Sequence, residues 1–403
     1  MSGGALRPTF EIALVVALYR SVQRLMIRQA LRSIPIARPD ISDAERELVA
    51  LVLSGDSLAL GPFVEEFERG IASLASRRYA VACSSGTAAL HLAVRGLGIG
   101  TGDEVITTPF SFVASANCIV YEGALPRMVD IEEETLGLDP DQVEAAVSGS
   151  TRAILAVDVF GQPCRLNDLE RLAARRGLDL IEDSCEALGS SLRGRPLGSF
   201  GAVSAFAFYP NKQITTGEGG ALVTDDPALA ALARSMRNQG RDEDGTWLRH
   251  VRLGFNYRMD ELSAALGVAQ LRRYRELRAK RAAVVAGYER ALADLDWLHL
   301  PRPVAGADVD WFVYVIRLNP EIDRGRLIGQ LDAAGIVSRP YFTPLHLQPV
   351  YRQILGTREG AFPVTERVAA STLALPFSTQ LTDDEIYRVA ETLVSAVAEQ
   401  FQA

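Results

Sequence analysis

Short apolar strands alternate with amphipathic helices along residues 41–224 of this 403-residue chain, and this rhythm restricts the fold more than any other feature. The expected strands are Tyr79–Cys83, Glu104–Thr107, Arg152–Val157, Leu178–Ile181, Ala202–Phe208 and Gly220–Thr224. The helices expected among them include Phe63–Leu74, Phe112–Tyr121 and Leu166–Arg176. Such alternation builds βαβ units, whose strands form a mostly parallel sheet with helices on both faces. The sequence therefore predicts an α/β fold.

The rhythm changes near Met259, where a long helical stretch over Glu261–Leu292 begins. A strand-like segment, Phe312–Leu318, and further helices follow it, which is the pattern of a smaller α+β unit. We therefore expect a large α/β domain over residues 34–258, a small C-terminal α+β domain over residues 259–403, and a separate extension over residues 1–33.

The first 33 residues carry five arginines and one glutamate, a net charge of +4, whereas the rest of the chain is acidic. An apolar run, Phe10–Leu18, precedes Arg20, Arg24, Arg28 and Arg32, which share one face of a helix. One interpretation is a basic amphipathic helix that contacts an anionic membrane. The other, which we favour, is a dispensable extension, or an upstream start codon with Met26 as the true initiator. No apolar run is long enough to span a membrane.

The composition excludes several classes of function. The formal net charge is −8, which argues against a protein that binds nucleic acid through a basic surface. Four scattered cysteines are too few for a disulfide framework, so a reducing cytoplasm is expected. The four histidines form no cluster with metal-ligand spacing, and no metal is expected.

Only two of the 42 basic residues are lysines, Lys212 and Lys280. Arginine stays protonated at neutral pH, so any chemistry that needs a side-chain amine must use one of these two. Lys280 lies in a highly charged helical stretch and is expected at the surface. Lys212 follows the strand Ala202–Phe208 and precedes the glycine-rich turn 215–220, a position that faces either a crevice or solvent.

Two further features favour the crevice. Asp183 follows the strand Leu178–Ile181, where open α/β sheets bind their ligands, although a helix N-cap would also suit it. The turn 85–88 joins a strand to a helix, so it is either a phosphate cradle or an ordinary helix cap. A lysine and an acid at neighbouring strand ends suggest pyridoxal phosphate, which needs an amine for covalent attachment and a carboxylate for its ring nitrogen.

At this point the chain resembles a known family. From about Ile34 to the C-terminus it is similar to the DegT/StrS-like sugar aminotransferases, pyridoxal-phosphate enzymes of fold type I. The segments that carry the resemblance are IPIARPDISDAE, LALGPFVEEFE, SSGTAALHLA, GDEVITTPFSFVASANCI, LIEDSCEALGS, GSFGAVSAFAFYPNKQITTGEGGALVTDD, LGFNYRMDELSAALG and SRPYFTPLHLQPVY.

The resemblance implies the roles of the cofactor site. Lys212 would attach the cofactor covalently and Asp183 would pair with its ring nitrogen. Phe112 would stack on the ring, and Gly86 and Thr87 would bind the phosphate. Both Lys212 and Asp183 are therefore the expected catalytic residues.

The resemblance also implies a homodimer with shared active sites, in which Asn256, at the cofactor, or Arg258, at the substrate, comes from the partner subunit. Tyr341 and His346 are expected in the sugar pocket, although either would also suit a packing role. The implied substrates are glutamate and a nucleotide-linked keto-sugar, small molecules used in polysaccharide biosynthesis.

The sequence departs from the family pattern at two positions. Ala207 replaces a serine that contacts the phosphate in many members, and Glu186 replaces a glutamine near the ring hydroxyl. A carboxylate there would repel the phenolate oxygen unless it is protonated or turned away. Two other functions stand beside the aminotransferase: a sugar dehydratase of the same family, in which histidine replaces the lysine, and a non-catalytic regulatory relative. The presence of both Lys212 and Asp183 favours the aminotransferase.

Overall fold

The structure is a computed structural model that describes residues 33–242 and 246–401. The interpretations of the basic N-terminal extension therefore lie, except for Ser33, outside the described residues. Within the described part of the chain, no helix is both long and apolar enough to cross a membrane.

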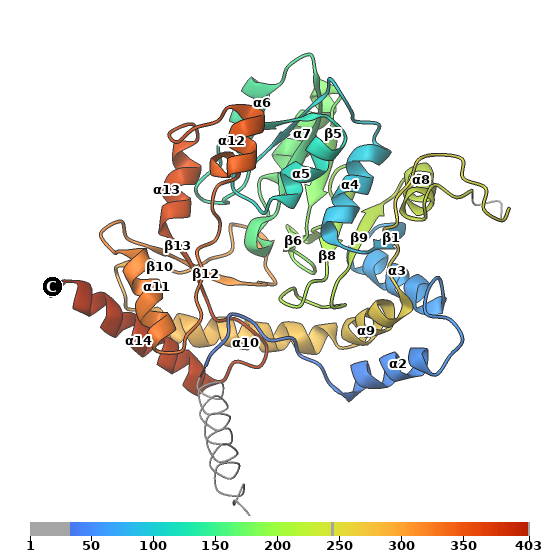
Figure 1. The fold of residues 1–403 in the computed structure, drawn as a ribbon. Coiled ribbons are helices and arrows are strands. Elements are labelled where there is room, and N and C mark those ends of the chain that lie inside the picture. The colour runs from blue at the N-terminus through green and yellow to red at the C-terminus, as the bar shows by residue number, and fades with distance from the viewer. Residues whose placement is uncertain (1–32, 243–245, 402–403) are drawn as a thin grey trace, which may run out of the picture.

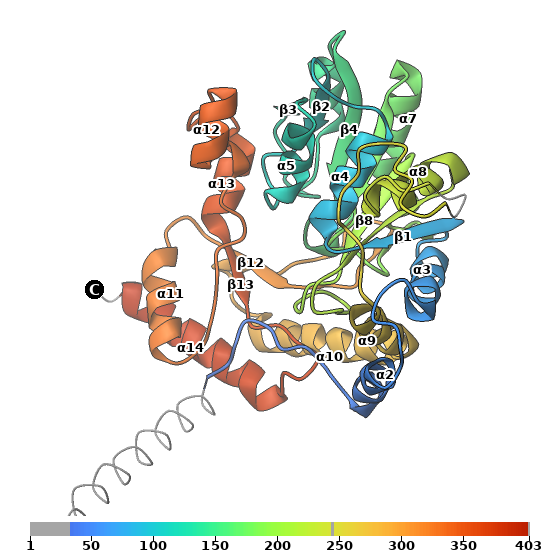
Figure 2. The same ribbon diagram turned by 45° about the vertical axis from the view of Figure 1, so that its right-hand side comes forward.

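A seven-stranded sheet forms the centre of the large part of the molecule, with the strand order β1-β9-β8-β5-β4-β2-β3 (Figures 1 and 2). Its strands are β1 (Tyr79–Cys83), β2 (Glu104–Thr107), β3 (Leu125–Met128), β4 (Thr151–Val157), β5 (Asp179–Asp183), β8 (Val203–Ala207) and β9 (Gly220–Thr224). Six of the strands run in one direction, and β9 runs antiparallel to both of its neighbours, β1 and β8. The mostly parallel α/β sheet that the sequence predicts is confirmed.

Helices cover both faces of this sheet because successive side chains of its strands point to opposite sides. In β4, Leu155 packs in the cluster beneath one layer of helices, while Ile154 and Ala156 pack beneath the other. The first layer contains α4 (Gly86–Gly96), α5 (Ala114–Tyr121) and α8 (Pro227–Arg237). The second contains α3 (Pro62–Leu74), α6 (Pro140–Ala146), α7 (Leu166–Arg176) and α9 (Glu261–Arg272). Most strands are thereby buried on both faces, whereas Leu125 and Arg127 of the edge strand β3 are exposed.

The C-terminal part is built on a three-stranded antiparallel sheet, β10-β12-β13. Its strands are β10 (Leu298–His299), β12 (Tyr314–Leu318) and β13 (Thr372–Leu375), and its helices are α10 (Tyr274–Leu292), α11 (Arg324–Ala333), α12 (Pro349–Leu355), α13 (Pro363–Ser371) and α14 (Asp383–Phe401). The remaining elements are α2 (Asp43–Leu53), β6 (Ser191–Leu192), β7 (Arg195–Pro196), β11 (Ala307–Asp308) and two 3₁₀ turns, Val159–Gly161 and Leu345–Leu347. Helix α10 runs beneath both parts of the molecule (Figures 1 and 2).

The long helical stretch expected over Glu261–Leu292 is divided at Arg273 into α9 and α10. The Arg273 side chain bonds to Asp40, Glu45 and Glu276, so it ties the break to a segment more than 200 residues earlier. Helix α9 packs against α2 and α3, whereas α10 packs against α14. The expected domain boundary at residue 259 stays a prediction.

Candidate active site

Parallel strands bring four predicted site residues to one edge of the sheet. Strands β1, β2, β5 and β8 run in the same direction. Gly86, Phe112, Asp183 and Lys212 each follow, or end, one of these strands. Because ligands of open α/β sheets bind beyond the carboxyl ends of the strands, this convergence defines a candidate site.

A cavity of about 340 Å³ lies at this edge and contains most of the predicted residues. Its lining includes Gly86, Thr87, Phe112, Asp183, Glu186, Lys212 and Tyr341. Ala207, which departs from the family pattern, also lines it. The Phe112 ring is 61% exposed, an unusual state for a phenylalanine, and it offers an open apolar face to a planar ligand.

Lys212 reaches this cavity between an acid and an aromatic ring. Its Nζ lies 3.4 Å from Glu186 Oε1 and 4.1 Å from the centre of the Phe312 ring. The lysine side chain is 13% exposed. Its amine is therefore shielded from bulk water, as a lysine that reacts with a ligand requires.

Asp183 ends β5 with its carboxylate already oriented. Ser115 Oγ donates to Asp183 Oδ2 at 2.6 Å, and the Cys185 N–H donates to Oδ1 at 3.2 Å. Ser115 is in turn hydrogen-bonded to Ser111 at 2.7 Å. These contacts fix the carboxylate, so it does not act as the cap of a helix. Sequence reasoning missed Ser115; its place three residues after Phe112, within the helix expected over Phe112–Tyr121, was the available signal.

The N-terminus of α4 points at the cavity through Gly86 and Thr87. Ser85 caps this helix, since its Oγ accepts from the Ala88 N–H at 3.1 Å. The turn is thus a helix cap, and the N–H groups of the following residues face the cavity with the positive end of the helix dipole. A Cβ on Gly86 would lie 2.6 Å from Ala207 Cβ and 2.9 Å from Cys185 Sγ. Glycine is therefore required for this close approach.

Glu186 is the second group in contact with the Lys212 amine, beside Phe312, and it is buried. Its Oε2 accepts from the Phe160 N–H at 2.8 Å, and Phe160 has φ +60°. Burial raises the pKa of Glu186, and the positive charge of Lys212 offsets part of that rise. The carboxyl group that replaces the usual glutamine thus contacts the lysine. Phe160 and Phe312 carried no sequence signal, because they meet the site only through the fold.

Three predicted residues do not line the cavity. Asn256 is exposed, and Arg258 Nη1 donates to Asn238 Oδ1 at 2.9 Å. His346 is fully buried, and its Nε2 lies 2.8 Å from Glu366 Oε1. Within a single chain, the structure therefore separates these three residues from Lys212 and Asp183.

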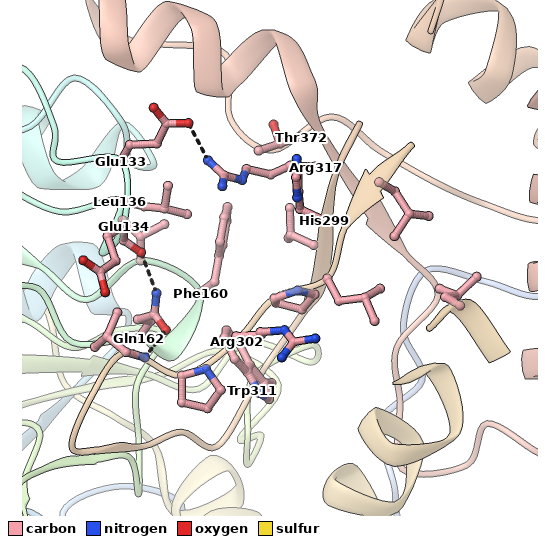
Figure 3. A pocket seen from close by; sticks show the side chains of 18 of the residues that line it. Glu133, Glu134, Leu136, Phe160, Gln162, His299, Arg302, Trp311, Arg317 and Thr372 are labelled. Atoms are coloured by element: carbon pink, nitrogen blue, oxygen red, sulfur yellow. Dashed lines mark hydrogen bonds and ion pairs between the residues drawn. The ribbon is translucent and has the colours of Figure 1, made fainter. Parts of the chain in front are cut away.

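A second cavity, of about 410 Å³, lies between the small sheet and the loops that follow β3 and β4 (Figure 3). Glu133, Phe160, Arg302 and Arg317 are among the residues that line it, and neither lysine does. Lys280 instead binds Asp40 and Glu276 on the surface of α10. The only lysine in a cavity with an oriented carboxylate is therefore Lys212, and because both lysines lie in the described residues, this holds for the whole chain.

The smaller cavity fits pyridoxal phosphate by the chemistry of its groups. It combines a shielded amine, a fixed carboxylate, an open aromatic face and a helix N-terminus. These four match the aldehyde, the ring nitrogen, the ring plane and the phosphate of the cofactor, respectively.

Comparisons with known proteins agree with this geometry. The family model of the DegT/DnrJ/EryC1/StrS aminotransferases matches residues 39–394. GDP-perosamine synthase of Caulobacter vibrioides is 39% identical over 366 residues, which cover 89% of this chain and 97% of the relative.

Two solved structures cover nearly the whole chain. DesI, solved in the presence of its TDP-sugar product, is 34% identical with a TM-score of 0.85, over 92% of this chain and 95% of DesI. Spr1654 of Streptococcus pneumoniae, solved in its PMP form, is 28% identical with a TM-score of 0.87, over 91% of this chain and all of Spr1654. This chain belongs to the DegT/DnrJ/EryC1/StrS aminotransferase family and is a sugar aminotransferase whose cofactor is pyridoxal phosphate.

Proposed function

We propose that this enzyme moves the amino group of glutamate to the keto group of a nucleotide-linked sugar. The observation that carries the proposal is the pairing of the shielded Lys212 amine with the fixed Asp183 carboxylate in one cavity. The substrate class is supported by GDP-perosamine synthase and by DesI with its TDP-sugar product.

We assign the cofactor contacts to residues of this cavity. Lys212 attaches pyridoxal phosphate, Gly86 and Thr87 bind its phosphate, and Phe112 stacks on its ring. Asp183, held by Ser115, keeps the ring nitrogen protonated. The cofactor supplies an electron sink for the carbon that loses its proton.

Residues of the chain then transfer the α-proton of the amino donor. The amine of Lys212, once released, takes the α-proton of the amino donor at its Nζ and returns it during amino transfer. Glu186 holds the lysine through a hydrogen bond, since its Oε1 accepts from Lys212 Nζ at 3.4 Å. The Phe312 ring, whose centre lies 4.1 Å from Lys212 Nζ, excludes water from the amine.

Tyr341 is the residue that we assign to the sugar, because it lines the same cavity as Lys212. His346 would support the same loop from beneath through its contact with Glu366. Asn256 and Arg258 would serve the cavity of a second copy, as the family resemblance implies.

A homodimer is supported by large apolar side chains exposed around the cavity. Phe112 and Tyr209 line it, and Leu60, Trp247 and Leu253 are exposed on loops of the same half of the chain. Patches of this kind mark interfaces. We also propose a cytoplasmic location, which the four unpaired cysteines support.

The test compares the two lysines. Purified enzyme is incubated with glutamate and a panel of nucleotide keto-sugars, and the aminated sugar is measured by mass spectrometry. We expect Lys212→Ala to abolish product even with added cofactor, and Lys280→Ala, at a surface ion pair, to keep activity within about twofold because such pairs contribute little. Amino transfer by the Lys212→Ala enzyme, or no transfer to any sugar by the unmodified enzyme, would refute the proposal.

A further inference from the structure

A buried polar cluster lies directly behind Lys212 and outside the cavity. Its members Gln213, Arg281 and Asp310 are 2%, 5% and 2% exposed, and none of them lines the cavity. Gln213 follows Lys212 in the chain, and its Nε2 donates to the carbonyl oxygens of Glu186 at 2.6 Å and Asp310 at 2.9 Å. The Gln213 side-chain amide thus joins the backbone next to Lys212 to the backbone at Glu186.

Arg281, on α10, holds the same cluster from the other side. It donates from Nη1 to the Gln213 carbonyl at 2.7 Å, and from Nε and Nη2 to the two Asp310 carboxylate oxygens at 2.7 and 2.6 Å. Asp310 also accepts from Tyr274 Oη at 2.8 Å. A two-pronged arginine–carboxylate contact of this kind fixes orientation as well as distance.

The cluster reaches both neighbours of the Lys212 amine. Glu186 is bound through its carbonyl, and Phe312, whose ring lies beside the amine, follows Asp310 by two residues. The packing leaves little freedom: a Cβ on Gly161 would lie 2.9 Å from the Glu186 carbonyl oxygen and 3.1 Å from that of Asp310. The positions of the acid, the ring and the lysine segment are therefore set by one rigid cluster.

We propose that Gln213, together with the Arg281–Asp310 pair, is a positioning residue that sets where the Lys212 amine lies between Glu186 and Phe312. The inference rests on the role of Lys212 proposed above. A displacement of about 1 Å of a reacting group costs roughly a hundredfold in rate, so loss of the cluster impairs Lys212 without touching any ligand.

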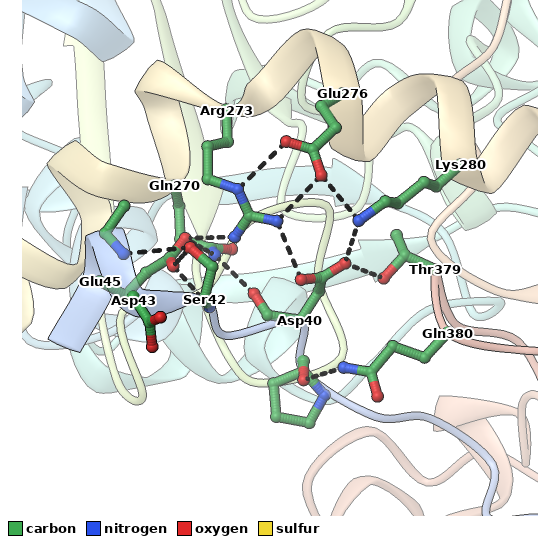
Figure 4. Close-up of polar contacts among 12 residues, drawn as sticks. Asp40, Ser42, Asp43, Glu45, Gln270, Arg273, Glu276, Lys280, Thr379 and Gln380 are labelled. Atoms are coloured by element: carbon green, nitrogen blue, oxygen red, sulfur yellow. Dashed lines mark hydrogen bonds and ion pairs between the residues drawn. The ribbon is translucent and has the colours of Figure 1, made fainter.

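A matched pair of variants separates positioning from stability. Gln213→Met removes both donors and keeps the length of the side chain. Gln270→Met is the control: Gln270 is also 2% exposed, and its Nε2 also makes two bonds, to the Asp40 carbonyl at 2.8 Å and to Glu45 Oε1 at 2.7 Å (Figure 4). Gln270 Oε1 also accepts a hydrogen bond from the Thr215 N–H at 3.4 Å, so the control residue contacts the loop that follows Lys212. Gln213→Met leaves two backbone carbonyl oxygens without a donor. Gln270→Met leaves the Asp40 carbonyl oxygen without a donor and the Thr215 N–H without an acceptor, while Glu45 Oε1 keeps its bond from Arg273. Each variant thus leaves two polar groups unpaired, so we expect similar drops in melting temperature.

The readout is covalent capture of pyridoxal phosphate by the cofactor-free enzyme. Capture is stopped with borohydride at successive times, and the labelled fraction of the Lys212 peptide is measured by mass spectrometry. We expect Gln213→Met to capture the cofactor at least tenfold more slowly than the unmodified enzyme, and Gln270→Met within twofold of it. With glutamate as donor, kcat of Gln213→Met falls while the KM for the sugar stays the same.

Equal capture rates for Gln213→Met and the unmodified enzyme would overturn the positioning role and leave the proposed function intact. Capture at a residue other than Lys212 in the unmodified enzyme would instead refute the proposed function. If Gln213→Met does not fold, Arg281→Lys replaces it, because lysine keeps the charge opposite Asp310 and loses the bond to the Gln213 carbonyl. The same slowing is then expected, and its absence overturns the proposal.

Discussion

Glu186 is the residue at which this site departs most from its family's usual pattern, because a carboxyl group replaces the usual amide. It is buried, it accepts from the Phe160 N–H, and it lies beside the Lys212 amine. Burial raises its pKa from an ordinary value of 4.5, because the desolvated carboxylate is disfavoured more than Lys212 stabilises it. The folded chain therefore binds the Glu186 proton more tightly than the unfolded chain does.

This difference predicts a pH-dependent stability. As pH rises above 4.5, the unfolded chain releases the proton of Glu186 first, so the unmodified enzyme loses stability through the raised pKa. The Glu186→Gln variant has a neutral side chain at this position, so it does not lose stability in this way. The free energy of unfolding of this variant, minus that of the unmodified enzyme, is expected to grow as pH rises above 4.5, by about 1.4 kcal/mol for each tenfold difference in proton affinity between the folded and unfolded chains. The cofactor-free forms are compared by calorimetry; parallel curves would mean that Lys212 keeps Glu186 ionised in the folded chain.

Among the elements, α4 meets the cavity through its N-terminus, where Gly86 and Thr87 line it. The approach depends on Gly86, whose missing Cβ leaves room for Ala207 and Cys185. Ala207 is itself small, so the site combines two residues without bulk at the contact between α4 and β8. A larger residue at either position would push the helix N-terminus away from the cavity.

Gly86→Ala is expected to weaken cofactor binding as well as the fold. The added methyl would meet Ala207 Cβ at 2.6 Å, and overpacking of this kind costs about 1–3 kcal/mol. Gly329→Ala is the control, because Gly329 lies inside α11 with no atom within 4 Å of its Cβ, and alanine there gains about 0.5–1 kcal/mol. Thermal unfolding and titration of pyridoxal phosphate by absorbance measure both effects. Cofactor affinity of Gly86→Ala equal to that of Gly329→Ala would contradict the assignment.

The elements also reveal what the sequence could predict. Strands Tyr79–Cys83, Glu104–Thr107 and Gly220–Thr224 have the expected bounds, because their local apolar pattern reports burial on both faces. The break at Arg273 was not predictable, since it depends on Asp40 and Glu45, which are distant in the chain. Helix α5 begins at Ala114, two residues later than expected, which leaves Phe112 in the preceding turn.

The same division applies to the site. The shared place of Lys212 and Asp183 in one cavity was predictable because each lies at or after the end of a strand, and strand ends of a parallel sheet converge. Ser115, Phe160 and Phe312 contact site residues that are distant in the chain, so no local sequence pattern predicts their place in the site. The burial of His346 against Glu366 likewise depends on helix α13, which follows it in the chain.

At the scale of the whole molecule, exposed apolar side chains gather on the loops near the cavity. Leu253 is 80% exposed, and Leu60, on the loop before α3, is 57% exposed. The two loops are linked to the site: Ala59 bridges to Asp260, and the Ser84 N–H donates to the Tyr257 carbonyl at 2.8 Å. Leaving such side chains in water costs about 25 cal/mol per Å² of apolar area, which a second copy of the chain would recover.

The proposed homodimer predicts that one charged residue on this surface weakens assembly and activity together. Leu253→Asp would bury a carboxylate at the interface, at a cost of about 3 kcal/mol, roughly a hundredfold in the dissociation constant. Val394→Asp is the control, because Val394 is 40% exposed on α14, outside these loops. Sedimentation should give twice the chain mass of 43.7 kDa for the unmodified enzyme and the control, and a lower average for Leu253→Asp. Because Asn256 or Arg258 of each copy would serve the other's cavity, the specific activity of Leu253→Asp should fall on dilution. A monomeric unmodified enzyme with full activity would contradict both the dimer and the shared site.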